Sequence, residues 1–157
     1  MVVNRVAVAI VAGAAGTLAL EAATYADMVL RGRPVSTVPQ DAIRRGARRI
    51  GLRGVAGDEP AARHRREGLA ALGGIATGLS VGALHGMLLG RRSRLVVDVL
   101  AAGGVAMIAG NAGAVAAGVT DPRRWRVSDW LADLLPHLCF GIGTAVTWRA
   151  IRAEAAR

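Results

Sequence analysis

Four long runs of apolar residues, separated by arginine-rich segments, dominate the hydrophobic pattern of this chain. The runs lie at about 6–30, 68–90, 95–120 and 130–151. Each reaches roughly the 20 residues that an α-helix needs to cross a hydrocarbon core about 30 Å thick. The pattern therefore predicts an all-α protein, a bundle of four transmembrane helices in a single domain that covers residues 1–157.

The longest connection, residues 31–67, contains a pattern that predicts a further short helix at about 38–50. Pro39 suits the first turn of such a helix, and its apolar positions fall on one side of the helix. The other side carries Arg44, Arg45, Arg48 and Arg49. A basic amphipathic helix of this kind is suited to lie among anionic lipid headgroups. Asp58 and Pro60 predict the start of a helix that runs directly into the second apolar run.

Composition agrees with a membrane protein and makes other classes less suitable. The chain is 53% hydrophobic and has 21 glycines, many of them inside the apolar runs, where membrane helices tolerate glycine. A net charge of +9 is compatible with binding nucleic acid. However, all 20 basic residues are arginines that cluster between the apolar runs, so membrane topology explains them better and no nucleic-acid partner is expected.

The arginines also predict an orientation. The connections after the first and third runs hold thirteen of them, against seven on the opposite side. The positive-inside rule then places the long basic loop in the cytoplasm and both termini outside, in the bacterial cytoplasmic (inner) membrane. Trp125 and Trp130 at one level, and Trp148 at the other, match aromatic anchoring at the two membrane interfaces.

Glycines repeat every four residues along the second run. They are Gly74, Gly78, Gly82, Gly86 and Gly90. A strip without side chains lets helix backbones approach closely, which favours association in lipid. The third run offers a complementary strip of small residues: Ala102, Ala106, Gly110, Ala114 and Gly118. We expect these two runs to pack as a close hairpin, and an oligomerisation surface is the alternative use of the strip.

Ionisable residues inside the runs should be paired, because each costs at least about 2.5 kcal/mol in a membrane. His85 and Asp98 flank the same short turn at similar depth, which predicts a pair across the hairpin. A second polar cluster, nearer the arginine-rich side, consists of Glu21, Tyr25, Asn111, Asp133 and His137. We expect Glu21 and His137 to face each other. Asn111 lies more than about 200° around the helix from Asp98, so the two should point at different neighbours.

No motif in the sequence names a reaction, a cofactor or a metal. His85 and His137 lie about 15 Å apart along the membrane normal, which argues against a shared haem or zinc. A carboxylate–histidine metal site at Glu21 and His137 stays open, although two ligands fall short of the three or four that metals usually need. Cys139 is the single cysteine, so neither an intramolecular disulfide nor a CxxC zinc site can form. An enzyme therefore has no positive support.

Two stretches carry a resemblance to known proteins: residues 25–34 with Ser36 and Pro39, and residues 120–138. Together they resemble small four-span actinobacterial membrane proteins of unknown function. More distantly, they are similar to YagU-like inner-membrane proteins, which share an acidic residue shortly before a histidine in the last span. The resemblance implies a four-helix membrane fold and makes Asp133 and His137 characteristic of the group.

Two functions follow as hypotheses. The first is a non-enzymatic accessory or assembly partner in the membrane, bound to another membrane protein or to a second copy of itself. The second is a small transporter or a proton or ion relay that uses the buried Glu/His and Asp/His clusters, since intramembrane ionisable residues often mark ion pathways.

Overall fold

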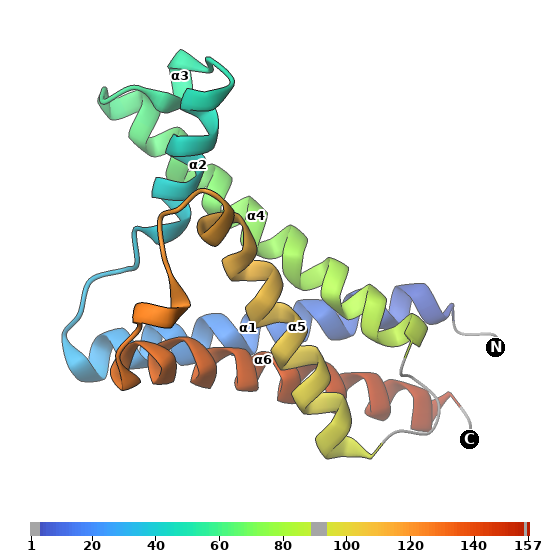
Figure 1. Ribbon diagram of the computed structural model, residues 1–157. Helices are drawn as coiled ribbons and strands as arrows, with labels where there is room; N and C mark the ends of the chain where they lie inside the picture. The colour runs from blue at the N-terminus through green and yellow to red at the C-terminus, as the bar shows by residue number, and fades with distance from the viewer. Residues whose placement is uncertain (1–3, 89–93, 156) are drawn as a thin grey trace.

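The computed structural model describes residues 4–88, 94–155 and 157, and these ranges contain helices and no strand. The elements are α1 (Arg5–Arg31), α2 (Val38–Arg49), α3 (Arg53–Ala56), α4 (Pro60–Leu88), α5 (Leu95–Ala116), the 3₁₀ helix η1 (Pro122–Arg124) and α6 (Val127–Glu154) (Figure 1). The predicted all-α class is confirmed. A helix is also present at each of the four apolar runs and at the basic segment in the long loop.

Three of the helices, α1, α4 and α5, are long and apolar enough to cross a membrane. The fourth long helix, α6, has 28 residues but is not among these three. Its apolar stretch is interrupted by Asp133, Pro136 and His137, which lower its hydropathy. By length and composition the structure thus contains three candidate spans, where the sequence pattern predicts four.

Local sequence explains where the long helices begin and end. The Asn4 side chain accepts a hydrogen bond from the backbone N–H of Val6 (3.0 Å) and caps α1. At the other end of α1, Gly32 adopts the left-handed conformation (φ 60°) that stops a helix. The backbone N–H of Arg126 donates to the Asp129 carboxylate (2.9 Å) at the start of α6, and this hydrogen bond lowers the pKa of Asp129. The helix then continues through Pro136 without a break.

The four long helices form two pairs that diverge at one end. α1 and α6 run side by side in opposite directions, and both chain termini lie at the same end of this pair (Figure 1). α4 packs on α1, and α5 packs on α6. Away from the termini, α4 and α5 lean away from the α1–α6 pair towards α2 and α3, which lie at the opposite end (Figure 1).

Glycines of α4 pack against α1, not against α5. A Cβ placed on Gly82 would lie 2.7 Å from the backbone oxygen of Ala9 and 2.7 Å from the backbone nitrogen of Gly13. A Cβ on Gly78 would meet the side-chain hydroxyl of Thr17, and a Cβ on Gly13 would lie 2.7 Å from the backbone oxygen of Gly78. The predicted close hairpin between α4 and α5 through this strip is therefore wrong, because α1 also presents small residues and takes the glycine face.

Other members of the predicted strip have different surroundings. Gly86 meets both Ala9 of α1 and the indole ring of Trp148 in α6. Gly74 has no neighbouring atom within 4 Å of an added Cβ, and Gly90 lies outside the described residues. Close packing thus covers only the part of the strip nearest the chain termini.

α5 and α6 cross through a second pair of glycines. A Cβ on Gly103 would lie 2.7 Å from the backbone oxygen of His137, and Gly141 lies directly against the backbone carbonyl of Val99. In the small-residue strip predicted on α5, Ala102, Ala106 and Ala114 are buried and Gly110 is exposed. Gly118 lies beyond the helix end with a left-handed φ of 71°. Alanines of the strip contribute to the helix packing, whereas the crossing itself depends on Gly103.

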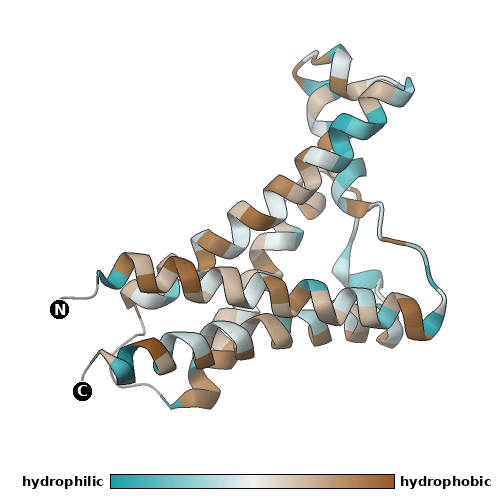
Figure 2. Ribbon diagram, turned by 180° about the vertical axis from the view of Figure 1, so that it is seen from behind, coloured by the Kyte–Doolittle hydropathy of each residue, from teal (hydrophilic) through white to brown (hydrophobic). Residues whose placement is uncertain are grey.

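Small side chains fill the interior and large ones face outwards. Among the residues that the structure describes, nine of the thirteen buried hydrophobic ones are alanines. Large aliphatic side chains such as Leu18 on α1 and Ile108 on α5 are each 73% exposed, and hydrophobic residues recur along the long helices (Figure 2). A surface of this kind is typical of a protein surrounded by hydrocarbon. Trp148, expected as an interface anchor, is only 2% exposed and belongs to the core.

Arginines hold the α2–α3 segment together through backbone carbonyls. Arg45 donates to the carbonyls of Ala117 (3.1 Å) and Gly118 (2.6 Å) just after α5. Arg66, which is buried, donates to the carbonyls of Val55 (2.6 Å) and Gly57 (2.8 Å). Guanidinium groups suit this role because they carry several donors in a fixed plane.

The predicted headgroup arginines on α2 therefore divide into two groups. Arg45 satisfies backbone carbonyls at the end of α5, and Arg44 pairs with Asp58. Both are engaged by the protein, which differs from the expectation that all four face lipid. Arg48 and Arg49 are exposed and available to a membrane surface.

The glycine contacts predict a sharp difference between two substitutions in one helix. Gly82→Leu should lower the free energy of unfolding by about 3 kcal/mol or more, because the added side chain meets backbone atoms that cannot rotate away. Gly74→Leu enters open space and should change it by less than about 0.5 kcal/mol. Thermal unfolding in detergent, followed by circular dichroism, measures both. Equal effects would show that α4 does not pack on α1 as described.

Candidate functional site

The most deeply buried charged group lies near the end that carries the termini. Asp98, in the first turn of α5, has a side chain only 3% exposed. The Nε and Nη2 atoms of Arg149 in α6 both donate to its Oδ2 atom, at 3.0 and 2.6 Å. Such charge-assisted hydrogen bonds, together with the positive end of the helix dipole, stabilise a buried carboxylate. Asp98 thus joins α5 to α6.

The predicted partner of Asp98, His85, is also close. Its Nε2 atom lies 3.9 Å from the Oδ1 atom of Asp98, with both side chains almost completely buried. The predicted pair is therefore brought together, although the separation exceeds a hydrogen bond. Asp98 and Arg149 both have further partners besides these. We call His85, Asp98, Arg149 and the adjacent Trp148 the His85 cluster.

Neither ring nitrogen of His85 has a hydrogen-bond partner, although the residue is 4% exposed. A buried polar group without a partner costs about 1–3 kcal/mol, and such groups are rare. The indole of Trp148 packs edge-on against the imidazole ring at 6.3 Å between centroids. His85 is therefore enclosed by an aromatic ring and a carboxylate without being satisfied by either.

Cations surround the same region. The guanidinium of Arg152 lies 5.3 Å from the centre of the Trp148 ring, and Trp148 in turn packs against His85. Arg5 of α1 donates to the backbone carbonyl of Gly86 (3.3 Å), next to His85 in α4. Arg149 thus binds the carboxylate itself, whereas Arg152 and Arg5 contact residues that lie next to His85.

A second group of polar contacts lies further along α5 and α6. The Asn111 Nδ2 donates to the Oδ2 of Asp133 at 2.8 Å, and to the backbone carbonyl of Met107 at 3.0 Å. The Nδ1 atom of His137 lies 2.6 Å from the backbone carbonyl of Asp133, so this nitrogen carries the hydrogen. We call Asn111, Asp133 and His137 the Asp133 cluster.

The structure divides the larger cluster predicted from the sequence. Asn111, Asp133 and His137 come together, whereas Glu21 interacts with Tyr25 one turn later in its own helix. Within the described ranges, no hydrogen bond or ion pair joins Glu21 to His137, so the predicted pair does not form. The ring of His137 lies against α5, where a Cβ on Gly110 would be 3.6 Å from its Nε2 atom, whereas Glu21 has its partner on α1.

Asp98 and Asn111 were expected to point at different helices, yet both contact α6. Asp98 meets Arg149, and Asn111 meets Asp133. The angle between the two residues around α5 does not separate their neighbours, because α5 and α6 approach so closely at Gly103 and Gly141 that residues on both flanks of α5 can reach α6. The length of the arginine side chain covers the remaining separation at Asp98.

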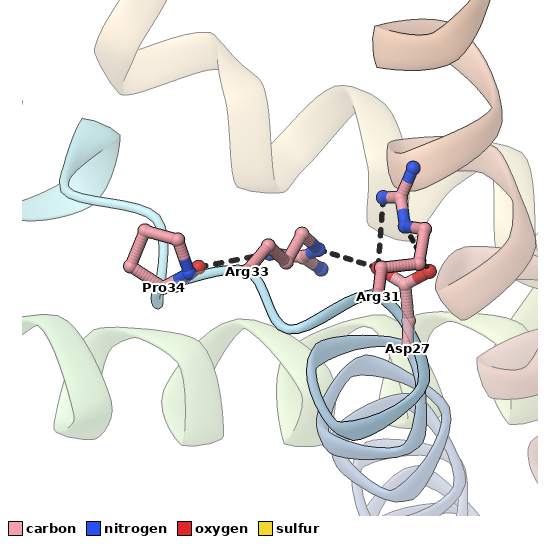
Figure 3. A network of polar contacts seen from close by, with 4 residues as sticks. All are labelled: Asp27, Arg31, Arg33 and Pro34. Carbon is pink, nitrogen blue, oxygen red and sulfur yellow. Dashed lines mark hydrogen bonds and ion pairs between the residues drawn. The ribbon is translucent and has the colours of Figure 1, made fainter.

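A third network lies at the end of α1, in the first of the two stretches that carry the family resemblance. Asp27 accepts hydrogen bonds from Arg31 (2.9 Å) and from the Nε of Arg33 (2.5 Å), and Arg33 also donates to the carbonyl of Pro34 (3.3 Å) (Figure 3). These contacts fix the direction in which the chain leaves α1. The aspartate and arginines of this stretch therefore have a structural role.

The second such stretch also stabilises a connection. The indole N–H of Trp125 donates to the hydroxyl of Thr120 (2.7 Å), and Asp121 accepts from the backbone N–H of Arg123 (3.1 Å). Trp125 and Trp130 pack edge-to-face with 5.0 Å between ring centroids. The residues between α5 and α6 thus form an ordered link.

The described residues contain no group of three or more His, Cys, Asp or Glu side chains that could hold a metal ion. The chemistry available in the two clusters is proton binding and electrostatic pairing between helices.

Arg149 and Trp148 are the site residues that the sequence pattern missed. Arg149 is near the end of the last apolar run and was counted among the loop charges. Asp98 lies just inside one span and needs a cation at the same depth on another span. Arg149 is the arginine that meets this requirement. Trp148 follows the buried Thr144 and Phe140 at four-residue spacing, which marks the same inward face.

Double-mutant cycles should separate the formed pair from the pair that does not form. Asn111→Ala and Asp133→Ala should be coupled by about 0.5–3 kcal/mol in the free energy of unfolding, because the side chains share a hydrogen bond. Glu21→Gln and His137→Gln should be additive within about 0.5 kcal/mol. Denaturant titration of the purified protein measures both cycles. The assignment is contradicted if the second pair is the coupled one.

Comparison of the chain with protein-family models, curated proteins and solved structures gives no match. The resemblance to YagU-like membrane proteins therefore stays a prediction.

Proposed function

We propose that this chain is a four-span protein of the bacterial cytoplasmic membrane in which α6 is the fourth span. Its Asp133 and Arg149 side chains meet Asn111 and Asp98 of α5, which reduces the cost of placing them in lipid. α6 also lies along α1, a candidate span, over most of its length (Figure 1). An even number of spans agrees with the position of both termini at one end of the molecule.

The end with α2 and α3 is proposed to face the cytoplasm. It carries the densest group of arginines, which the positive-inside rule places on that side. Exposed Arg48 and Arg49 on α2 are positioned for anionic lipid headgroups, since their neighbours Arg44 and Arg45 have protein partners.

We further propose that the protein acts as an accessory or assembly partner of another membrane protein. One observation carries this proposal: residues 67–76 of α4 are left uncovered by the rest of the chain. Leu72 is 64% exposed there, and Gly73 and Gly74 have no atom within 4 Å of an added Cβ. We call residues 67–76 the open α4 segment.

The open α4 segment continues a helix that elsewhere binds its neighbour through glycines. Gly78 and Gly82 lie in close backbone contact with α1. Gly74, one turn earlier, has the same four-residue spacing but no occupant. A glycine that faces lipid does not stabilise the protein, whereas a glycine that faces another helix lets the two backbones approach closely. The proposed occupant is a transmembrane helix of another membrane protein with small residues on its face.

The relay alternative has less support, because an apolar layer separates the two polar clusters. Val81, Ala102, Ala106 and Phe140 form a buried hydrophobic cluster. On α5 the two alanines lie between Asp98 and Asn111, and on α6 Phe140 lies between His137 and Arg149. The buried polar groups therefore do not form a chain from one membrane face to the other.

Assembly can be tested with two matched glycine substitutions, both into open space. Gly74→Leu should abolish the larger complex that the parent forms when membranes are extracted into polymer nanodiscs, while the protein stays folded. Gly104→Leu on α5, also without neighbours within 4 Å, should leave the complex intact. Native mass measurement gives the size and composition of each species.

Each result of this experiment bears on the proposal. A complex that contains a second type of protein and is lost only in Gly74→Leu supports it. A complex that contains only this chain assigns the open α4 segment to self-association and contradicts an accessory role. A monomeric parent, or a Gly74→Leu variant that assembles like the parent, also contradicts it.

The orientation predicts opposite labelling of two introduced cysteines, in a Cys139→Ser background. Arg49→Cys on α2 should react with a membrane-impermeant maleimide only after the cells are opened, because α2 faces the cytoplasm. Arg157→Cys at the other end should react on intact cells. Labelling of Arg49→Cys on intact cells would overturn the proposed topology.

A further inference from the structure

Two features of His85 are not explained by packing or by an assembly role. Its side chain is 2% exposed, and both ring nitrogens are without a hydrogen-bond partner. It also faces a carboxylate, with its Nε2 atom 3.9 Å from the Oδ1 of Asp98. A neutral imidazole makes no direct polar contact in this position.

Binding of a proton would give the His85 ring the polar contacts that the neutral ring lacks. The imidazolium has donors on both nitrogens and a positive charge that the Asp98 carboxylate attracts. A small movement would shorten the 3.9 Å separation to a charge-assisted hydrogen bond. The ligand that fits the unpartnered ring is therefore a proton.

Arginines on the surrounding helices act against this proton. On α6, Arg149 holds the other oxygen of Asp98, and Arg152 lies over the ring of Trp148. On α1, Arg5 binds the carbonyl of Gly86, next to His85. On α5, Asp98 is the carboxylate that favours the proton, and both Asp98 and Arg149 have further partners. The Asp98 carboxylate thus favours a charged His85 ring, and Arg149, which binds the same carboxylate, opposes it.

The cluster lies close to the membrane face that carries both termini. His85 lies three residues before the end of α4, and Asp98 lies three residues after the start of α5, so both are about 5 Å from the helix ends. The side chain of Arg149 is 41% exposed and leads from Asp98 to that surface. In the other direction, Val81, Ala102, Ala106 and Phe140 close the interior.

We propose that His85 is a proton-binding site, open to the membrane face that carries both termini, and that its protonated ring shares the Asp98 carboxylate with Arg149. With neutral His85, Asp98 joins α5 to α6. With protonated His85, the same carboxylate also joins α5 to α4. The site therefore links the protonation state at one membrane face to the contact between α4 and α5, independently of the proposed assembly role.

Trp148 provides a direct reporter, because its ring lies edge-on to His85 at 6.3 Å. Replacing Trp125 and Trp130 by phenylalanine leaves Trp148 as the single tryptophan. In lipid nanodiscs, the emission of Trp148 should fall as the pH is lowered, with one transition between about pH 5 and 8, because an imidazolium beside an indole quenches its fluorescence. His85→Gln should lose this transition, while His64→Gln and His137→Gln should retain it.

A second measurement does not depend on the fold of the His85 variant. In the protein with His64→Gln and His137→Gln, His85 is the only histidine, and ¹⁵N NMR of its ring reports its charge directly. The ring shifts should change from neutral to protonated values over the same pH range. Ring shifts that stay neutral throughout, or a Trp148 transition that persists in His85→Gln, would overturn the proposal.

Discussion

Backbone-to-backbone contact between helices is the constraint on which this structure depends. α1 approaches α4 at Gly13 and Gly82 and approaches α6 at Gly16 and Gly143, while α5 crosses α6 at Gly103. In a membrane, apolar burial cannot drive helices together, so association relies on close packing and on interhelical hydrogen bonds. The interior is accordingly made mostly of alanine and glycine, and the few large groups inside it, Phe140 and Trp148, fill the space next to the crossings.

Close packing also decides where polar groups can be placed. Asp98 meets Arg149 on one side of the α5–α6 crossing, and Asn111 meets Asp133 on the other, because the helices are near enough for both contacts. Between these two contacts lies a buried apolar cluster of Val81, Ala102, Ala106 and Phe140. Polar interactions are thereby confined to two separate levels, one near the chain termini and one nearer α2, instead of forming a continuous path.

Sequence patterns were sufficient for the helices but not for their partners. The length of the apolar runs predicts the long helices, and Asp58 and Pro60 predict the start of α4. Asn4 and Gly32, which end α1, add local signals of the same kind. Depth along a span also brought His85 and Asp98 together correctly. Which helices pack together is harder to predict from the sequence. Small residues occur on every long helix, so a glycine strip on α4 fits α1 as well as α5. A pair such as Glu21 and His137 can share a depth and still face different helices.

Arginine was the residue type whose role was hardest to infer from position. Counting arginines as charges explains the expected orientation, but Arg45, Arg66 and Arg149 act as hydrogen-bond donors to specific carbonyl or carboxylate groups. Arg149 in particular lies at the boundary where a span ends and a loop begins. Such residues can be recognised only when an opposite charge at the same depth is considered together with them.

The pairing of α5 with α6 has a consequence for biogenesis. In the proposed four-span arrangement, α6 carries Asp133 and Arg149 into the bilayer, and the groups that bind them, Asn111 and Asp98, are both on the helix made immediately before it. Alone, either helix would expose unpaired polar groups to lipid, whereas the two together cover them. The last two helices are therefore expected to leave the translocon as one hairpin. The short ordered link closed by Thr120 and Trp125 holds them close together from the moment α6 is synthesised.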